Sequence, residues 1–157
     1  MALLFAARMS HIAISMTYVS LVGEIGQNRE GKREDGLGNE TFLKPSDVTA
    51  LNNRSTPVFT ALSCDVGNGA LPGWNGSLAG ALVLNPNGGA ITAFAPTGVS
   101  LDSDAQVIGL GFADYLIGGR LSAGQAAREA QIQSAGRVTP FMLGVYQILG
   151  DPAVPVP

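Results

Sequence analysis

The residues of this 157-residue chain best suited to nucleophilic chemistry are its one cysteine, Cys64, and its one histidine, His11. Cys64 directly follows the short apolar run Pro57–Ser63, and a glycine-rich stretch comes after it. This pattern predicts a buried strand with a thiol at its carboxyl end, where a thiolate can attack and backbone N–H groups can hold an oxyanion. The alternative is a small core residue, because free cysteine is among the most buried residue types.

His11 lies 53 residues before Cys64, a separation similar to the roughly 50 residues between histidine and cysteine in some peptidases. The expected strands nevertheless separate the two side chains. His11 precedes the strand predicted at Ile12–Val22, whereas Cys64 follows its own strand, so a parallel sheet places them roughly 30 Å apart. A general base must lie about 3 Å from the proton it takes. We therefore expect a structural or surface histidine.

Three aspartates and one glycine-rich turn have a chemical and a structural interpretation. Asp65 is the only charged residue in a long apolar stretch, and it either binds a cationic group or, as we favour, caps the loop after the cysteine. Asp102 and Asp104 are expected to stabilise the amino end of the next helix. Asn85–Gly89 has the glycines of a phosphate loop but lacks the Lys-Ser/Thr of a Walker motif, which favours a plain turn.

Composition excludes several classes of protein. The chain is 46% hydrophobic and only 13% charged, which is unlike a disordered chain, and its length suits one compact domain. Nine Lys and Arg against twelve Asp and Glu form no basic stripe, so we expect no nucleic-acid partner. A single cysteine forms no internal disulfide framework, and no Cys/His cluster indicates a metal or cofactor site.

The apolar segment Ala2–Gly23 is interrupted by Arg8, His11 and four hydroxyl residues. It therefore falls short of the ~18 consecutive apolar residues that a membrane-spanning helix needs. It also lacks the positively charged start and the small-residue cleavage site of a signal peptide. We expect no membrane association, and the sequence assigns no cellular location.

Alternating strands and helices predict an α/β fold, a parallel sheet covered by helices on both faces, with sites beyond the carboxyl ends of the strands. Residues 24–44 hold nine of the 21 charged residues and predict a solvated loop. Strands are expected at 12–22, 57–63 and 90–95, and helices at 47–51 with Ser46 as N-cap, 77–84, 103–117, 122–134 with Ser122 as N-cap, and 140–149.

From about Phe42 to Ala153 the chain resembles the carboxyl-terminal half of the gingipain-type (C25) cysteine peptidase domain. The resemblance implies a caspase-like fold, a peptidase acting on peptides or proteins, and Cys64 as its nucleophile. It also divides the chain into a poorly matching segment, 1–41, and the carboxyl-terminal part of a peptidase domain, 42–157. The matching pieces occur in the family's order: Pro45-Ser46-Asp47-Val48, Leu51-Asn52-Asn53, Pro57–Cys64, Pro72-Gly73, Ser77-Leu78-Ala79, Ala81–Ala90, Ala95-Pro96-Thr97-Gly98 and Leu149–Ala153.

The chain departs from the family at the general base. The family carries a Tyr-x-Gly-His-Gly motif before the cysteine strand, whose His is the general base and whose second Gly helps form the oxyanion hole. Here Tyr18-Val19-Ser20-Leu21-Val22 stands at that place, with Leu21 at the His position. Losing a general base typically costs about 10²–10⁴ in rate. The sequence thus leaves two main hypotheses, a cysteine peptidase and a non-catalytic relic, and a weaker third, a phosphate or nucleotide binder.

The resemblance also implies that about half of a complete domain precedes Met1, including the first strands of the sheet and part of the substrate pocket. A half-sheet has an open strand edge, and unpaired edges attract other strands. We therefore expect the missing amino-terminal half or another chain to pair there. Members of the family are often secreted or held at the cell surface.

Overall fold

The computed structural model describes the backbone of residues 4–9, 12–17, 32–33 and 40–41, and both backbone and side chains of residues 45–70 and 76–155.

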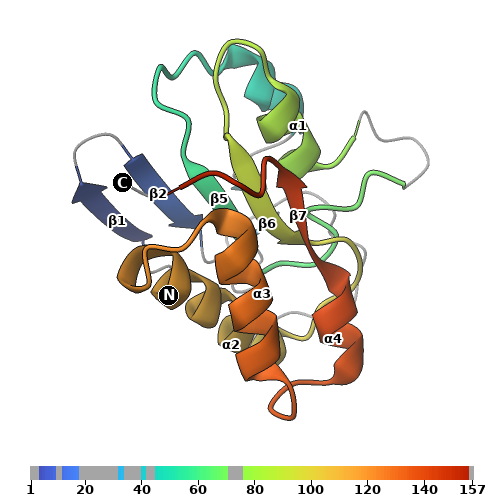
Figure 1. The fold of residues 1–157 in the computed structure, drawn as a ribbon. Coiled ribbons are helices and arrows are strands. Elements are labelled where there is room, and N and C mark those ends of the chain that lie inside the picture. Colours follow the sequence, from blue (N-terminus) through green and yellow to red (C-terminus); the bar gives the residue numbers. More distant parts are fainter. Residues whose placement is uncertain are drawn as a thin grey trace.

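A five-stranded sheet forms the centre of the fold, in the order β1-β2-β5-β6-β7 (Figure 1). The three middle strands, β2, β5 and β6, run parallel, whereas β1 and β7 run antiparallel to their neighbours. The predicted α/β class is therefore confirmed, with the parallel pairing confined to the middle of the sheet. The strands are β1 (Leu4–Met9), β2 (Ile12–Thr17), β5 (Val58–Ala61), β6 (Thr92–Pro96) and β7 (Tyr146–Gly150); β3 (Lys32–Arg33) and β4 (Glu40–Thr41) form a separate small pair within the predicted loop.

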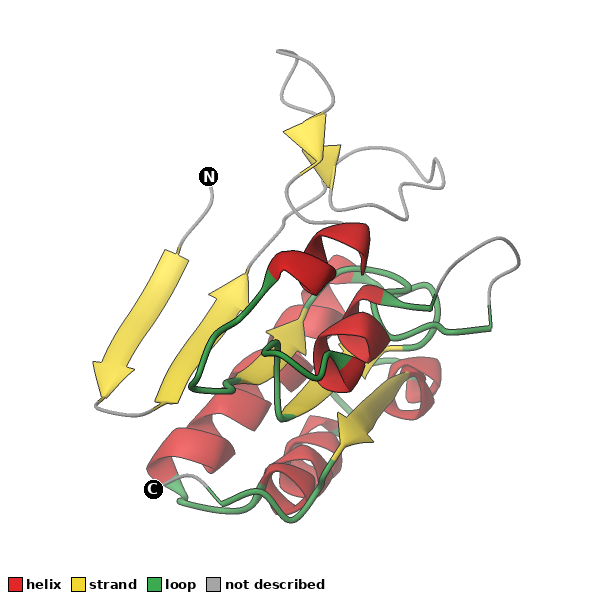
Figure 2. Ribbon diagram, turned by 90° about the horizontal axis from the view of Figure 1, so that it is seen from above, coloured by secondary structure: helices red, strands yellow, loops and turns green. Residues whose placement is uncertain are grey.

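Helices cover both faces of the sheet, as Figure 2 shows from above. On one face lie α2 (Asp102–Ala113), the π-helix η2 (Asp114–Gly118), α3 (Ala123–Ser134) and α4 (Pro140–Val145). On the other face lies α1 (Leu78–Leu84), with the 3₁₀-helix η1 (Pro45–Ala50) packed against it. The helix predicted at 103–117 is thus α2 continued by η2.

Strand β6 is buried along its whole length and divides the core into two layers. Phe94 packs on the face covered by α2, α3 and α4, with its ring centroid 4.5 Å from that of Phe112 and 5.1 Å from that of Tyr146. Its neighbours Ala93 and Ala95 face the opposite layer. A strand that is apolar on both faces is typical of the middle of a sheet covered on both sides.

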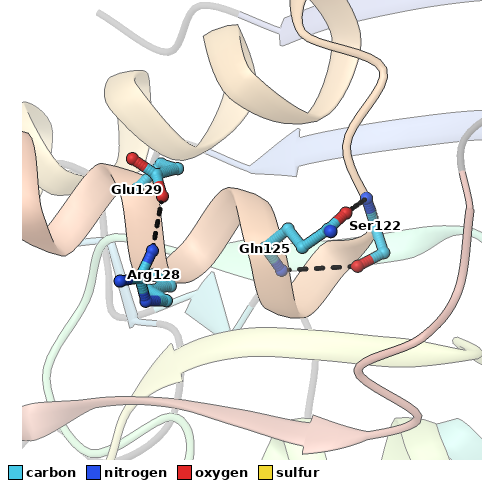
Figure 3. Close-up of polar contacts among 4 residues, drawn as sticks. All are labelled: Ser122, Gln125, Arg128 and Glu129. Atoms are coloured by element: carbon cyan, nitrogen blue, oxygen red, sulfur yellow. Dashed lines mark hydrogen bonds and ion pairs between the residues drawn. The ribbon is translucent and has the colours of Figure 1, made fainter.

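Of the two serine caps that the sequence predicted, Ser122 is observed, and the helix expected at 77–84 also begins with a serine cap. Ser77 caps α1 by accepting a hydrogen bond from the Gly80 N–H at 3.0 Å. Ser122 and Gln125 form a reciprocal capping box at the start of α3, one turn before the Arg128–Glu129 ion pair (Figure 3). Ser46 as N-cap is wrong, because η1 already begins at Pro45, a residue that suits the first helical position.

The helix predicted at 140–149 is wrong in its second half. Helix α4 ends at Val145, and Tyr146–Gly150 forms strand β7 in antiparallel register with β6. Gly144 weakens the end of the helix, and Tyr146 and Ile148 are residues that favour strands. Pairing with the open edge of β6 decides the outcome, because it satisfies the backbone of both strands.

The turn Asn85–Gly89 ties α1 and β6 to the segment after η1. The Asn85 side-chain amide donates to the Val48 carbonyl at 2.7 Å and to the Leu51 carbonyl at 3.2 Å. Asn53 and Gly89 exchange two hydrogen bonds, at 2.7 and 3.0 Å. These contacts give the turn a structural role that accounts for Asn85.

Helices α2 and α4 are joined at their amino ends by one carboxylate. Asp104 Oδ2 accepts hydrogen bonds from the backbone N–H of Thr139 at 2.8 Å and from its hydroxyl at 3.0 Å. Thr139 is the N-cap residue of α4, so Asp104 supplies the cap from a neighbouring helix. The hydrogen bond from the Thr139 backbone is the main reason why the pKa of the Asp104 carboxyl lies below its usual 3.8.

We predict that Gly89→Ala destabilises the protein much more than Gly136→Ala. Both glycines have positive φ, 87° and 81°, but a Cβ at Gly89 would collide with the Leu82 carbonyl oxygen, whereas nothing lies within 4 Å of one at Gly136. Gly136→Ala should cost about 1 kcal/mol and Gly89→Ala about 3 kcal/mol or more in urea unfolding. Equal losses would contradict the close approach at Gly89.

We also predict that the Asp104–Thr139 contact stabilises the protein at neutral pH but not in acid. Because the folded pKa is lowered, the contribution is complete above the unfolded value of 3.8 and is lost as the pH falls through the folded value. The gap in unfolding free energy between wild type and Asp104→Asn should therefore close as the pH falls from 5 to about 2. A gap for Asp104→Asn that persists at low pH would contradict the prediction.

Candidate functional site

Cys64 lies in the turn that follows β5, three residues beyond the last strand residue Ala61. Its side chain is exposed, whereas Leu62, two residues earlier, is buried in the main core cluster. The sequence left open whether the thiol is a core residue or lies at the rim of the sheet. The structure places it at the rim.

The backbone reverses direction immediately after the cysteine. Asp65 has φ of 60°, in the left-handed region that few residues other than glycine adopt. Asn68 fixes this turn by donating its backbone N–H to the Asp65 carbonyl and its side-chain amide to the Asp65 carboxylate, both at 3.0 Å. Asp65 therefore organises the loop, as its expected capping role required, and the tight reversal leaves Cys64 at the outside of the turn.

The turn after β5 is joined to the loop after β6 by backbone hydrogen bonds. The Asp65 N–H donates to the Gly98 carbonyl at 2.9 Å, and the Gly67 N–H donates to the Pro96 carbonyl at 2.8 Å. A Cβ at Gly67 would lie 3.2 Å from the Pro96 oxygen, so the absence of a side chain permits this close approach. The carboxyl ends of the two parallel strands thus form one rigid rim.

Ser100, in the loop after β6, has three polar atoms close to the sulfur of Cys64. Its backbone N–H donates to Sγ at 3.2 Å, and its hydroxyl lies 3.5 Å from Sγ. In the thiol form the S–H group donates to the Ser100 carbonyl at 3.3 Å. These contacts join residues 36 positions apart, and they fix where the sulfur lies on the rim.

Helix α4 holds the loop after β6 in place by hydrogen bonds. The backbone and hydroxyl of Thr97 donate to the Val145 carbonyl at 2.9 and 3.0 Å, and the Leu101 N–H lies 3.4 Å from the sulfur of Met142. The loop is therefore anchored on both sides of Ser100.

Tyr146 supports the end of β5 from inside the core. It is fully buried, and its hydroxyl donates to the Ala61 carbonyl at 3.1 Å. Burial raises its pKa far above the ordinary value, and the nearby charges of Cys64 and Asp102 add to this. The phenol therefore stays protonated and remains a donor at neutral pH.

His11 and Leu21 lie outside the described residues. The sequence argued against His11 as the general base and placed Leu21 at the family's histidine position. The strand that begins after His11, β2, does run parallel to β5, and its last residue Thr17 pairs with Ala61. The parallel pairing on which the argument against His11 depended is therefore present.

Sequence reasoning missed Ser100 as the partner of the thiol, and it missed Thr97, Met142 and Tyr146 as residues that hold the surrounding loop and strand end. No local pattern marks Ser100, because its contact with Cys64 is made across the sheet. Tyr146 had a signal, since Gly144 interrupts the predicted helix just before it.

Within the residues that the structure describes, no three His, Cys, Asp or Glu side chains gather in a way that would hold a metal ion. The described helices are also too short to cross a lipid bilayer, since α2 and α3 have 12 residues each.

Comparison with known proteins gives two findings. The family model for peptidase family C25 matches residues 14–157. The fold is similar to that in the crystal structure of the Arg-specific cysteine proteinase gingipain R, with a TM-score of 0.66 and 16% sequence identity over 74% of this chain. The match covers 29% of the gingipain R chain, so this sequence spans under a third of that protein.

The chain matches no curated protein. At 16% identity the likeness to gingipain R shows the fold alone. The family match extends over most of the sequence and includes the strand, the turn and the loop that surround Cys64. This chain therefore belongs to peptidase family C25.

Proposed function

We propose that Cys64 is the nucleophile of a cysteine peptidase site whose substrates are peptides or proteins, and that residues 42–157 are the carboxyl-terminal part of the peptidase domain. The observation that carries this proposal is the exposed sulfur at the rim of two parallel strands, in a chain of the C25 family. Sites in such sheets lie beyond the carboxyl ends of the strands.

The reaction begins when the Cys64 thiolate attacks the carbonyl carbon of the scissile peptide bond. The C–N bond then breaks, the amine leaves with a proton taken from water, and an acyl group remains on sulfur as a thioester. Hydrolysis by a second water releases the acid and restores the thiol. A neighbouring base speeds both the ionisation of the thiol and the protonation of the amine.

The described part of the chain contains no histidine, and the sequence carries Leu21 where the family has its catalytic one. We therefore propose that this chain works slowly on ordinary peptide bonds. The thiol must ionise by losing its proton to solvent, and the leaving amine receives no proton from an imidazolium.

A non-catalytic role is the second candidate, and Leu21 is the observation that favours it. In that case the chain is a binding or structural module that pairs, at an open sheet edge, with the rest of the peptidase domain or with another chain. The two candidates differ in whether the sulfur turns over a substrate, which the following experiments measure.

We expect the purified chain to cleave a mixture of unstructured peptides at a rate about 10²–10⁴ below that of an enzyme with a general base. Cys64→Ala should abolish this activity without changing the melting temperature, because the thiol is exposed. Cleavage products are followed by mass spectrometry. If wild type and Cys64→Ala give the same products at the same rate, Cys64 is not the nucleophile.

Leu21→His should increase cleavage at least tenfold at neutral pH, since it places an imidazole at the family's general-base position. Val19→His, which adds the same group at the variable position of the motif, is the matched control and should give no increase. A Leu21→His chain that is folded and as inactive as wild type would favour the non-catalytic role.

A further inference from the structure

We infer that Ser100 is a positioning residue for Cys64 and that its hydroxyl donates a hydrogen bond to the sulfur that becomes stronger when the thiol ionises. This inference rests on the proposed role of Cys64 as nucleophile.

The first observation is that Ser100 contacts the sulfur with every polar atom it has. Its N–H and hydroxyl lie 3.2 and 3.5 Å from Sγ, and its carbonyl oxygen lies 3.3 Å away. Two of these groups can donate to a thiolate, while the carbonyl can only accept from a thiol. The same residue therefore offers partners to both protonation states of Cys64.

Loss of the thiol proton changes the strength of each hydrogen bond between Ser100 and the sulfur. The S–H···O=C hydrogen bond to Ser100 is lost, whereas the hydrogen bonds from the N–H and the hydroxyl become charge-assisted and stronger. Hydrogen bonds to the charged form of a group favour that form. The hydroxyl is the one contribution of the side chain, so substituting it separates its effect from that of the backbone.

The loop holds the hydroxyl in place before any substrate arrives. Thr97 is bound to Val145, Gly98 to Asp65, and Leu101 to Met142, so anchors lie on both sides of Ser100. A donor fixed in this way loses little freedom when it binds the thiolate, which makes its hydrogen bond more effective. In a chain with leucine at the family's histidine position, such donors gain importance.

Three other titratable groups belong to the elements around the sulfur. They are Asp65 in the same turn, Asp102 at the start of α2, and Tyr146, whose pKa burial raises. Because burial raises the pKa of Tyr146, its phenol stays protonated between pH 6 and 10. A titration between pH 6 and 10 therefore reports on the thiol.

The test is the rate of alkylation of Cys64 by iodoacetamide across pH 6 to 10, followed by intact-protein mass, which requires no peptidase activity. Ser100→Ala should slow alkylation at pH 7 by roughly two- to tenfold and move the midpoint of the pH profile upward, with the limiting rate at high pH unchanged. Ser100→Thr, which keeps the hydroxyl, should restore the wild-type profile. Ser103→Ala, a nearby serine bonded to Asp104 instead, is the matched control and should match wild type.

An unchanged midpoint in folded Ser100→Ala would overturn the inference, and so would a Ser100→Thr profile that matches Ser100→Ala. A change confined to the limiting rate would also overturn it, because that indicates altered access of the reagent. Circular dichroism confirms that each variant is folded. These outcomes are independent of peptide cleavage: a shifted midpoint without turnover supports the role of Ser100 and contradicts the proposed peptidase, while turnover without a shift does the reverse.

Discussion

The pair of backbone hydrogen bonds between the turn after β5 and the loop after β6 is the constraint on which the site depends. Asp65 and Gly67 donate to Gly98 and Pro96, and this pairing continues the sheet beyond the ends of its parallel strands. This pairing holds the turn that carries Cys64 beside the loop that carries Ser100, so the contact between the two residues depends on it. Reactive cysteines are partly exposed and lie where the thiolate is favoured, and the rim meets the first of these conditions at Cys64.

The carboxyl-terminal quarter of the chain supports this rim from below. Asp104 fixes the start of α4, and the end of α4 binds Thr97 next to the rim. The strand that follows brings the Tyr146 hydroxyl to Ala61 at the end of β5. The Leu149–Ala153 piece of the family pattern lies in and just after this strand. Its presence fits a structural role in closing the edge of β6.

Several elements of the fold could be predicted because interactions between neighbours in the sequence determine them. The apolar run ending at Cys64, the serine cap of α3, and the asparagine turn before β6 are set by neighbours in sequence, and each lies where the sequence indicated. The wrong cap at Ser46 is a local failure, whereas the other failures involve contacts between distant parts of the sequence. Tyr146 enters a strand because the edge of β6 is open, and Ser100 meets Cys64 because two strand ends are adjacent. No window of sequence contains both partners of either contact. For the general base, the sequence argument rests on Leu21, which lies outside the described residues.

The most direct measurement is the formation of an acyl adduct on Cys64 from a peptidyl p-nitrophenyl ester. This leaving group departs without being protonated, so attack by the thiolate is tested separately from the missing base. After an acid quench, mass spectrometry of the digested protein should show the peptidyl group on the fragment that contains Cys64, and hydroxylamine should remove it. A thiol that iodoacetamide modifies fully but that never carries the peptidyl group would contradict the account.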